Sequence, residues 1–213
     1  MASTTPTKAL DERFAEVIFS TNEMLIAQCY KEALPKLNQK QSIIQGSTVR
    51  IESSYDSSHM AFGIVAKINN SSLDSIHKPS ALGLTSIQLE QLQPQVYDLL
   101  RNELEIYLFA HKDSHGNIVN SPPLKPMMIH DFVYKTSEEE VLKLTGDFSY
   151  LISIIKSKQL KPDLLLDLIS LGYRLRDSNY NYLVNAGKEF SIAFSNEIET
   201  LMQVLKRLSE IPI

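Results

Sequence analysis

Residues 46–68 read GSTVRIESSYDSSHMAFGIVAKI, and this stretch decides the fold class. In its first part, Val49 and Ile51 alternate with polar neighbours, which is the pattern of a half-buried strand. Its second part, residues 59–68, is apolar and places Gly63 in mid-strand, where a glycine indicates a bulge or a tight bend. Two short strands separated by a polar turn predict an antiparallel barrel or sandwich.

Neighbouring segments repeat this pattern. A turn sequence, Ser20-Thr21-Asn22, separates two apolar runs near the N-terminus, and the prolines of residues 121–126 cannot lie inside a helix. The polar stretches 35–45 and 69–80 predict loops. The expected strands are residues 13–19, 24–30, 46–53, 59–68 and 129–134.

A helical insertion is expected near residues 85–105. Thr85 and Gln88 have the spacing of a capping box, which predicts a short helix over residues 86–92. Pro94 is suited to start a second helix, and Leu100, Leu104 and Leu108 continue its apolar spacing. The end of this second helix is left open, because residues 106–110 fit a helix or a strand.

The pattern changes after Thr136. Ser137 and Glu140 form another capping box, and apolar residues follow at helical spacing as far as Ile155. Helices are also expected from Pro162, over residues 183–194, and after Asn196, with Glu199 completing that cap. The predicted fold class is α+β: a disordered tail over 1–11, an antiparallel β domain over 12–136 that is a barrel or a sandwich, and a helical bundle over 137–213.

Composition narrows the function classes. The chain has 213 residues, 43% of them hydrophobic, and a formal net charge of −4. No half of the chain is basic, so direct nucleic-acid binding is not expected. Cys29 is the single cysteine, which excludes an internal disulfide and favours a buried, inert thiol in a reducing compartment. No apolar run is long enough to cross a bilayer.

The order of the β elements resembles the HAS barrel, found at the N-terminus of HerA-type DNA translocases and of the catalytic-head subunits of rotary ATP synthases. The resemblance covers residues 12 to about 142. Gly46 before one strand, the Gly63-Ile64-Val65 step and the prolines before the closing strand carry it. The matching segments are FAEVIFS, MLIAQCY, GSTVRIES, FGIVAKI, LEIYLFAH, SPPLKP and HDFVYKT, followed by EEEVLKL.

The resemblance implies that residues 12–136 form a small antiparallel β-barrel, and that this barrel docks on a ring or a neighbouring subunit. HerA-type proteins carry an ATPase after the barrel, whereas this chain has only Asn185-Ala186-Gly187-Lys188-Glu189. The upstream glycine of a phosphate-binding loop is missing, and Glu189 replaces its hydroxyl residue, so we expect no ATP binding there. The layout, including residues 81–100, is similar to small HAS-barrel proteins of cyanobacteria and algae, which implies the cytoplasm or the plastid stroma.

The histidines offer no motif for chemistry. His111 and His115 have the spacing of a metal pair on a helix, but residues 113–116 form a turn, so an exposed hairpin tip is favoured. His130 and Asp131 are expected in a strand with side chains on opposite faces, which disfavours a catalytic pair. The acidic run 138–140 fits the first turn of a helix.

Two hypotheses follow. The first is a non-enzymatic interaction or assembly module, without catalytic, cofactor or metal residues, that docks on a larger complex through its barrel and its bundle. Its partners are other proteins or further copies of the chain. The second is an enzyme or small-ligand-binding protein with a cleft between barrel and bundle, for which His130, Tyr134 and Arg174 are the candidates.

A cluster of tyrosine and arginine residues between 173 and 182 has the composition of a protein interface, in which both residue types are enriched. The alternative is a helix end at which arginines interact with the helix dipole. The candidate interface residues are Tyr173, Arg174, Arg176, Tyr180 and Tyr182.

The apolar stretch 78–84 is expected either to dock a partner protein or to pack against the mouth of the barrel.

Overall fold

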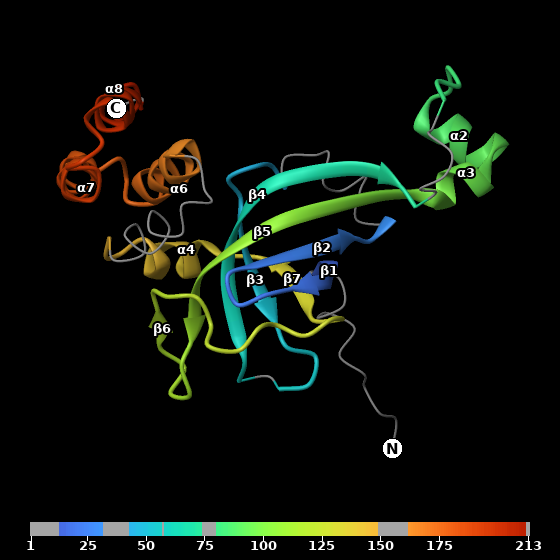
Figure 1. The fold of residues 1–213 in the computed structure, drawn as a ribbon, viewed down its shortest axis with the longest axis horizontal. Helices are drawn as coiled ribbons and strands as arrows, with labels where there is room; N and C mark the ends of the chain where they lie inside the picture. Colours follow the sequence, from blue (N-terminus) through green and yellow to red (C-terminus); the bar gives the residue numbers. More distant parts are fainter. Residues whose placement is uncertain (1–12, 32–42, 57, 74–79, 149–161, 212–213) are drawn as a thin grey trace.

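The computed structural model describes residues 13–31, 43–56, 58–73, 80–148 and 162–211 (Figure 1). The expected tail over 1–11 and residues 149–155, the last part of the helix expected after Ser137, lie outside these ranges. Within them the strands are β1 Arg13–Ser20, β2 Met24–Cys29, β3 Thr48–Glu52, β4 Met60–Ser72, β5 Leu100–Lys112, β6 Ile118–Val119 and β7 Phe132–Lys135. The helices are α2 Ser86–Leu92, α3 Pro94–Leu99, α4 Glu138–Leu144, α6 Pro162–Arg174, α7 Tyr180–Ala193 and α8 Ile198–Ser209.

Six of the strands close into an antiparallel barrel. They follow the order β2-β1-β7-β3-β4-β5, and β2 pairs with β5 to complete the circle. The short strand β6 extends β5 as a hairpin outside the circle. The expectation of an α+β protein with a small antiparallel barrel is therefore confirmed.

Strands β4 and β5 are buried on both faces where they cross the middle of the molecule. Val65, Ile106 and Leu108 point into the barrel, and Phe62 and Phe109 belong to a second core that includes the helices. Strands covered on both sides need near-continuous apolar runs, which explains sequences such as IYLFA. Gly63 marks a register shift against β5, as its position in mid-strand predicted.

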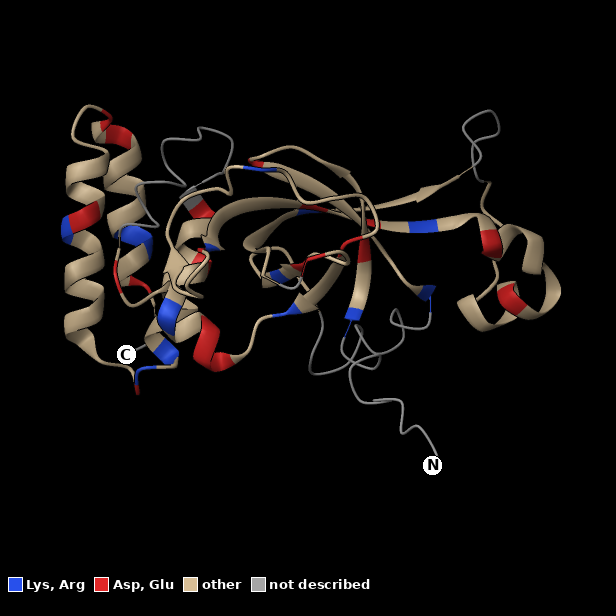
Figure 2. Ribbon diagram, turned by 90° about the horizontal axis from the view of Figure 1, so that it is seen from below, with Lys and Arg blue, Asp and Glu red and all other residues tan. Residues whose placement is uncertain are grey.

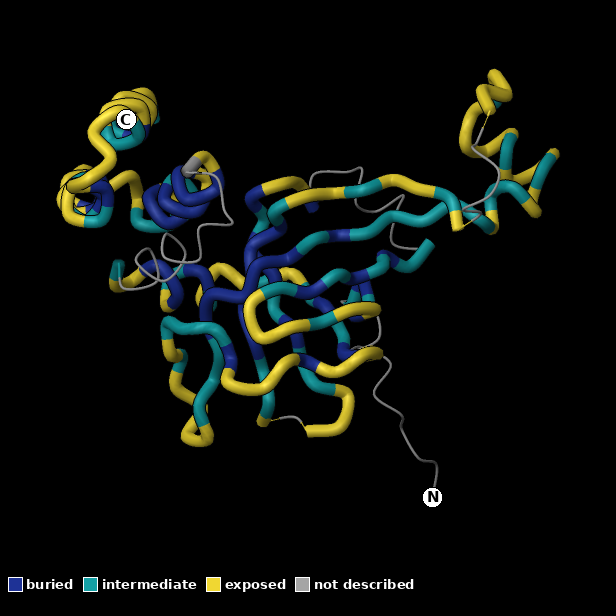
Figure 3. The backbone as a smooth tube through the Cα atoms, in the orientation of Figure 1, coloured by how far each residue is buried: buried dark blue, intermediate teal, exposed yellow. Residues whose placement is uncertain are grey.

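Helices α6, α7 and α8 contact one another and share this second core with the outer face of β4 and β5. Figure 3 shows α6 buried along its inner side, whereas α7 and α8 are exposed along their outer sides. Leu164, Leu168 and Ile169 of α6 are buried in this core. The capping box of Ser137 and Glu140 opens α4 as predicted.

Several predicted boundaries are wrong. The helix expected to carry Leu104 and Leu108 ends at Leu99, because residues 100–112 pair with strands on both sides. Strand β4 continues to Ser72, through part of the predicted loop 69–80. Helix α7 begins at Tyr180, after an Asn179 cap.

The cap predicted for α8 is also wrong. This helix follows Glu197 and has no side-chain cap, so Asn196 and Glu199 do not form a capping pair. Among the described helices, none combines the length and the apolar character needed to cross a membrane.

Candidate interaction surface

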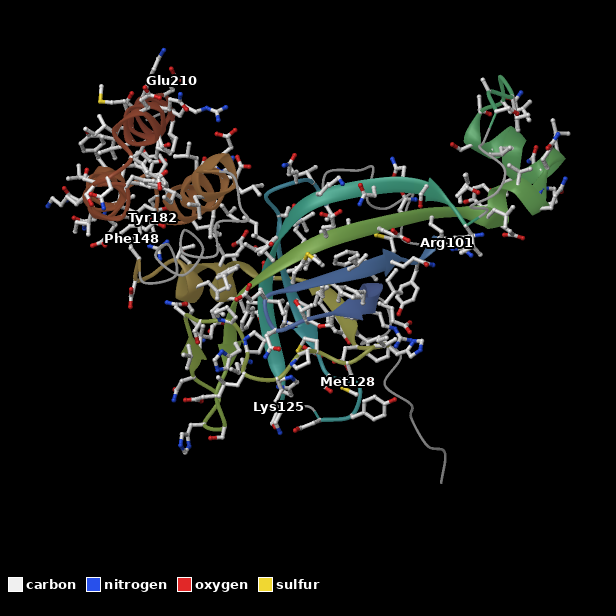
Figure 4. All side chains as sticks on the ribbon, viewed as in Figure 1. Arg101, Lys125, Met128, Phe148, Tyr182 and Glu210 are labelled. Atoms are coloured by element: carbon white, nitrogen blue, oxygen red, sulfur yellow. The ribbon has the colours of Figure 1, made fainter. Side chains whose placement is uncertain are left out.

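One end of the barrel exposes a group of large apolar side chains, which we call the barrel-end patch. Tyr55 is 78% exposed and Leu124 is 90% exposed. Figure 4 shows Met128 and Lys125 toward the same end of the barrel. The patch consists of Ile18, Phe19, Tyr55, Leu124, Met128 and Ile129.

Hydrogen bonds join the segments that carry these residues. Val17 exchanges hydrogen bonds with the turn before β7: its N–H donates to the Asp131 carbonyl, and its carbonyl accepts from the His130 N–H. The side chain of Asn22 donates to the Leu124 carbonyl oxygen at 2.6 Å. A bulge in β1 at Ile18 interrupts the strand alternation, so Ile18 and the next residue are both exposed.

The buried carboxylate of Asp131 holds the patch loops in place. The N–H and the hydroxyl of Ser54 donate to Asp131 Oδ1 at 2.7 and 3.1 Å, and the Met128 N–H donates to Oδ2 at 2.7 Å. Asp131 is 0% exposed. Hydrogen bonds to a charged acceptor are about twice as strong as neutral ones, so Asp131 fixes the positions of neighbouring Tyr55 and Met128.

The prediction that His130 and Asp131 lie in a strand is wrong. His130 has a φ of +74°, and β7 starts only at Phe132. A left-handed backbone conformation is uncommon for a residue with a side chain. Two hydrogen bonds hold this turn: the Met128 N–H donates to the Asp131 carboxylate, and the His130 N–H donates to the Val17 carbonyl. The His130 ring pairs with Glu16, whose other oxygen accepts from the Tyr30 hydroxyl at 2.9 Å.

Tyr30 is therefore part of a polar chain beside the patch. Burial raises the pKa of Tyr30 to about 12, and its hydrogen bond to the Glu16 carboxylate adds to this shift. The polar chain joins β1, the segment after β2 and the turn before β7, so it adds to the rigidity of this end of the barrel.

The predicted tyrosine–arginine interface is mostly internal, which corrects that prediction. Tyr173 and Tyr182 are buried. The Arg176 guanidinium donates to Thr145 Oγ1 at 2.9 Å and to the carbonyls of Gly172 and Leu142 at 2.9 and 2.8 Å.

These contacts make Arg176 a clamp between two helix ends. It lies over the Tyr182 ring, 4.6 Å from its centroid, and Figure 4 shows Phe148 next to Tyr182. Carbonyls at a helix C-terminus lack partners within the helix, so an arginine that reaches two such ends stabilises both. Only Arg174 and Tyr180 of the five predicted residues are exposed.

A cleft of about 580 Å³ lies between the barrel and the helices. Arg174 lines it, whereas His130 and Tyr134, the other two candidates for a ligand site, do not. Asp167 also lines the cleft, and burial raises the pKa of its carboxyl, with the charge of Asp163 adding to the shift. The remaining lining residues include Gln45, Thr48, Lys135, Thr136, Glu138 and Ser170.

The structure also places the histidines, the cysteine and the segment 185–189 that the sequence analysis considered. His115 lies at the exposed hairpin tip between β5 and β6, as predicted, while His111 Nδ1 is 2.8 Å from the Ser121 carbonyl. Cys29 is buried, and burial raises its pKa to about 11. Residues 185–189 lie inside α7, as predicted. Within the described ranges, no group of three or more His, Cys, Asp or Glu side chains is placed to hold a metal ion.

Charges are scattered over the described surface. Figure 2 shows acidic and basic residues interspersed on the barrel and the helices, whereas α2 and α3 carry acidic residues only. Comparison with protein-family models and with curated proteins gave no match to this sequence.

Proposed function

We propose that this chain is a non-enzymatic interaction module that docks on a partner protein through the barrel-end patch. The observation that carries the proposal is the combination of exposed apolar side chains with loops held by the buried Asp131 carboxylate. Exposed apolar groups that gather on one surface mark binding sites more often than single ones do. Aromatic residues and methionine are also enriched at the centres of interfaces.

Rigid loops favour binding because less conformational freedom is lost when the complex forms. The Asp131 carboxylate accepts hydrogen bonds from the N–H of Met128 itself and from the N–H of Ser54, which precedes Tyr55. Burying one large apolar side chain contributes about 1.5–3 kcal/mol, so a few such residues are enough for a specific contact. Lys125, near Asp56, would supply charge at the rim.

The likeness to HAS barrels is part of the proposal. It suggests a host complex of the DNA-processing or membrane-enzyme class, located in the cytoplasm or the plastid stroma. The barrel would contact this host, and α6, α7 and α8 would form a helical bundle that presents a second surface.

The test is affinity purification from the native cell with a matched pair of variants. The combined variant Leu124→Asp/Met128→Asp should lose the partner that the wild-type chain recovers in stoichiometric amount. The control Ile192→Asp changes a residue of α7 that is 66% exposed, and it should keep the partner. Equal recovery by all three proteins, or no stoichiometric partner for the wild type, would contradict the proposal.

The cleft of about 580 Å³ favours a second candidate, a small-ligand-binding protein or enzyme. Its volume lies within the range of ligand pockets, and Arg174 and Asp167 offer charges of both signs. Native mass spectrometry of the gently purified protein should then show a bound small molecule. The cleft-filling variant Ser170→Trp should lose that molecule, while the same preparation of the Leu124→Asp/Met128→Asp variant should retain it.

A further inference from the structure

The helices α2 and α3 form an arm that extends beyond the barrel. The ladder between β4 and β5 continues to the pair Ser72–Leu100, although β2 pairs with β5 only as far as Glu103. Figure 1 shows the two helices at the end of this ribbon, far from α6, α7 and α8. The described part of the arm is residues 80–99.

The arm buries none of its own helix residues. Neither α2 nor α3 has a buried residue, and Ile87 and Leu92 are 68% and 66% exposed. Figure 3 shows the described part of the arm as exposed and intermediate. Helices of seven and six residues are too short to be stable alone in water, so they need a packing partner.

The base of the arm is fixed to the barrel by Lys31. Its ammonium pairs with Asp98 at 2.7 Å and lies over the Tyr97 ring, 5.3 Å from the centroid. This contact orients the arm before any partner binds. It also neutralises Asp98, one of the two charged residues between 80 and 99.

The surface chemistry of the arm suits a second copy of itself. Residues 80–99 contain no lysine or arginine, and their charged residues are Glu90 and Asp98, of which Asp98 pairs with Lys31. Gln91 and Gln95 are exposed, and an amide side chain both donates and accepts hydrogen bonds. In a two-fold contact each residue near the axis meets its own copy, which favours apolar and amide groups over charges.

We propose that the arms of two copies pack against each other around a two-fold axis, so that the chain forms a dimer. The contact buries apolar residues of α2 and α3 and pairs their glutamines. The barrels stay apart, because the ribbon holds each arm away from its own barrel. This contact is independent of the barrel-end patch, which remains free for a different protein.

The first experiment measures the mass of the full chain by sedimentation over a range of concentrations. The wild type should be a dimer, and Ile87→Glu/Leu92→Glu should raise the dissociation constant at least about tenfold by placing like charges in the contact. Replacing residues 73–99 by Asn-Gly, which joins the facing residues Ser72 and Leu100 through a two-residue turn, should give a monomer with an intact barrel. Ile192→Glu, at similar exposure on α7, should remain a dimer.

Because the double substitution also weakens the arm itself, cysteine cross-linking provides a second measurement. Cys29 is buried, so a new cysteine at Gln91 reports on the arm alone. Gln91→Cys should give covalent dimers with a flexible bis-maleimide reagent, and Ser195→Cys, in the turn between α7 and α8, should not. A monomeric wild type at about 100 µM, equal dimerisation after arm removal, or cross-linking at residue 195 alone would overturn the proposal. Loss of partner binding through the barrel-end patch would leave these results unchanged.

Discussion

The Asp131→Asn substitution tests whether the buried carboxylate holds the barrel-end patch. The carboxylate is 0% exposed and accepts hydrogen bonds from two backbone N–H groups, of Ser54 and Met128, and from the Ser54 hydroxyl. Asparagine has the same shape, but its amide NH₂ must face one of these donors. One N–H group then loses its acceptor, and the other bonds to a neutral oxygen.

The expected cost follows from these contacts. A hydrogen bond to a charged group contributes about 1.5–3 kcal/mol, and a buried donor without a partner costs about 1–3 kcal/mol. The two contributions overlap, because the lost hydrogen bond and the unpaired donor partly describe the same N–H group, so they are not simply added. We expect a net loss of about 3 kcal/mol in the free energy of unfolding. At the urea dependence usual for chains of this size, the unfolding midpoint should fall by roughly 1–1.5 M.

Equilibrium urea unfolding followed by far-ultraviolet circular dichroism is the suitable assay, because the chain has no tryptophan. Asp113→Asn is the matched control. Asp113 also accepts from two backbone N–H groups, at 2.8 Å each, but it lies in an exposed turn where water replaces a lost partner. The reasoning is refuted if the two variants shift the unfolding midpoint equally.

Three further predictions concern packing, helix ends and thiol reactivity. Gly63→Ala should destabilise the barrel by about 1–3 kcal/mol, because the new Cβ would lie 2.6 Å from a backbone carbonyl oxygen of β5. Gly187→Ala is the control: its new Cβ would meet only ordinary contacts at 3.6 Å, so it should stabilise α7 by up to about 1 kcal/mol. The urea assay measures both changes. Arg176→Ala should lower the thermal unfolding midpoint by several degrees, because it removes three hydrogen bonds to the ends of α4 and α6. Arg174 is exposed, so Arg174→Ala should leave that midpoint nearly unchanged in calorimetry. In the folded protein, Cys29 should react with iodoacetamide at pH 8 at least ~100-fold more slowly than after unfolding in urea. Burial raises its pKa to about 11, which leaves little thiolate, and also blocks the reagent. Equal rates would show that the thiol is accessible.

Local signals in the sequence were sufficient for several elements. Thr85 and Ser137 each open a helix through a capping box whose partners are three residues away, so the pattern needs no other part of the chain. The strand around Val49 and the bulge at Gly63 were also predictable, because alternation and a mid-strand glycine reflect local geometry.

Residues 100–112 show where local signals fail. Leu100, Leu104 and Leu108 recur every four residues and favour a helix, yet the segment is β5. Its backbone hydrogen bonds go to β2 on one side and β4 on the other, and the side chains of residues 106–110 are buried on both faces. Such pairing between distant segments overrides the modest helix propensity of leucine.

The candidate sites depended on tertiary structure most of all. Composition identified the tyrosines and arginines of residues 173–182, but only the packing of α4 against α6 showed that Arg176 binds helix ends inside the protein. The barrel-end patch had no sequence signal, because it joins β1, the β3–β4 loop and the turn before β7 through Asp131. The sequence by itself determined caps, turns and alternation, which act over a few residues; the tertiary structure decided exposure and side-chain partners, because these depend on segments far apart in the chain.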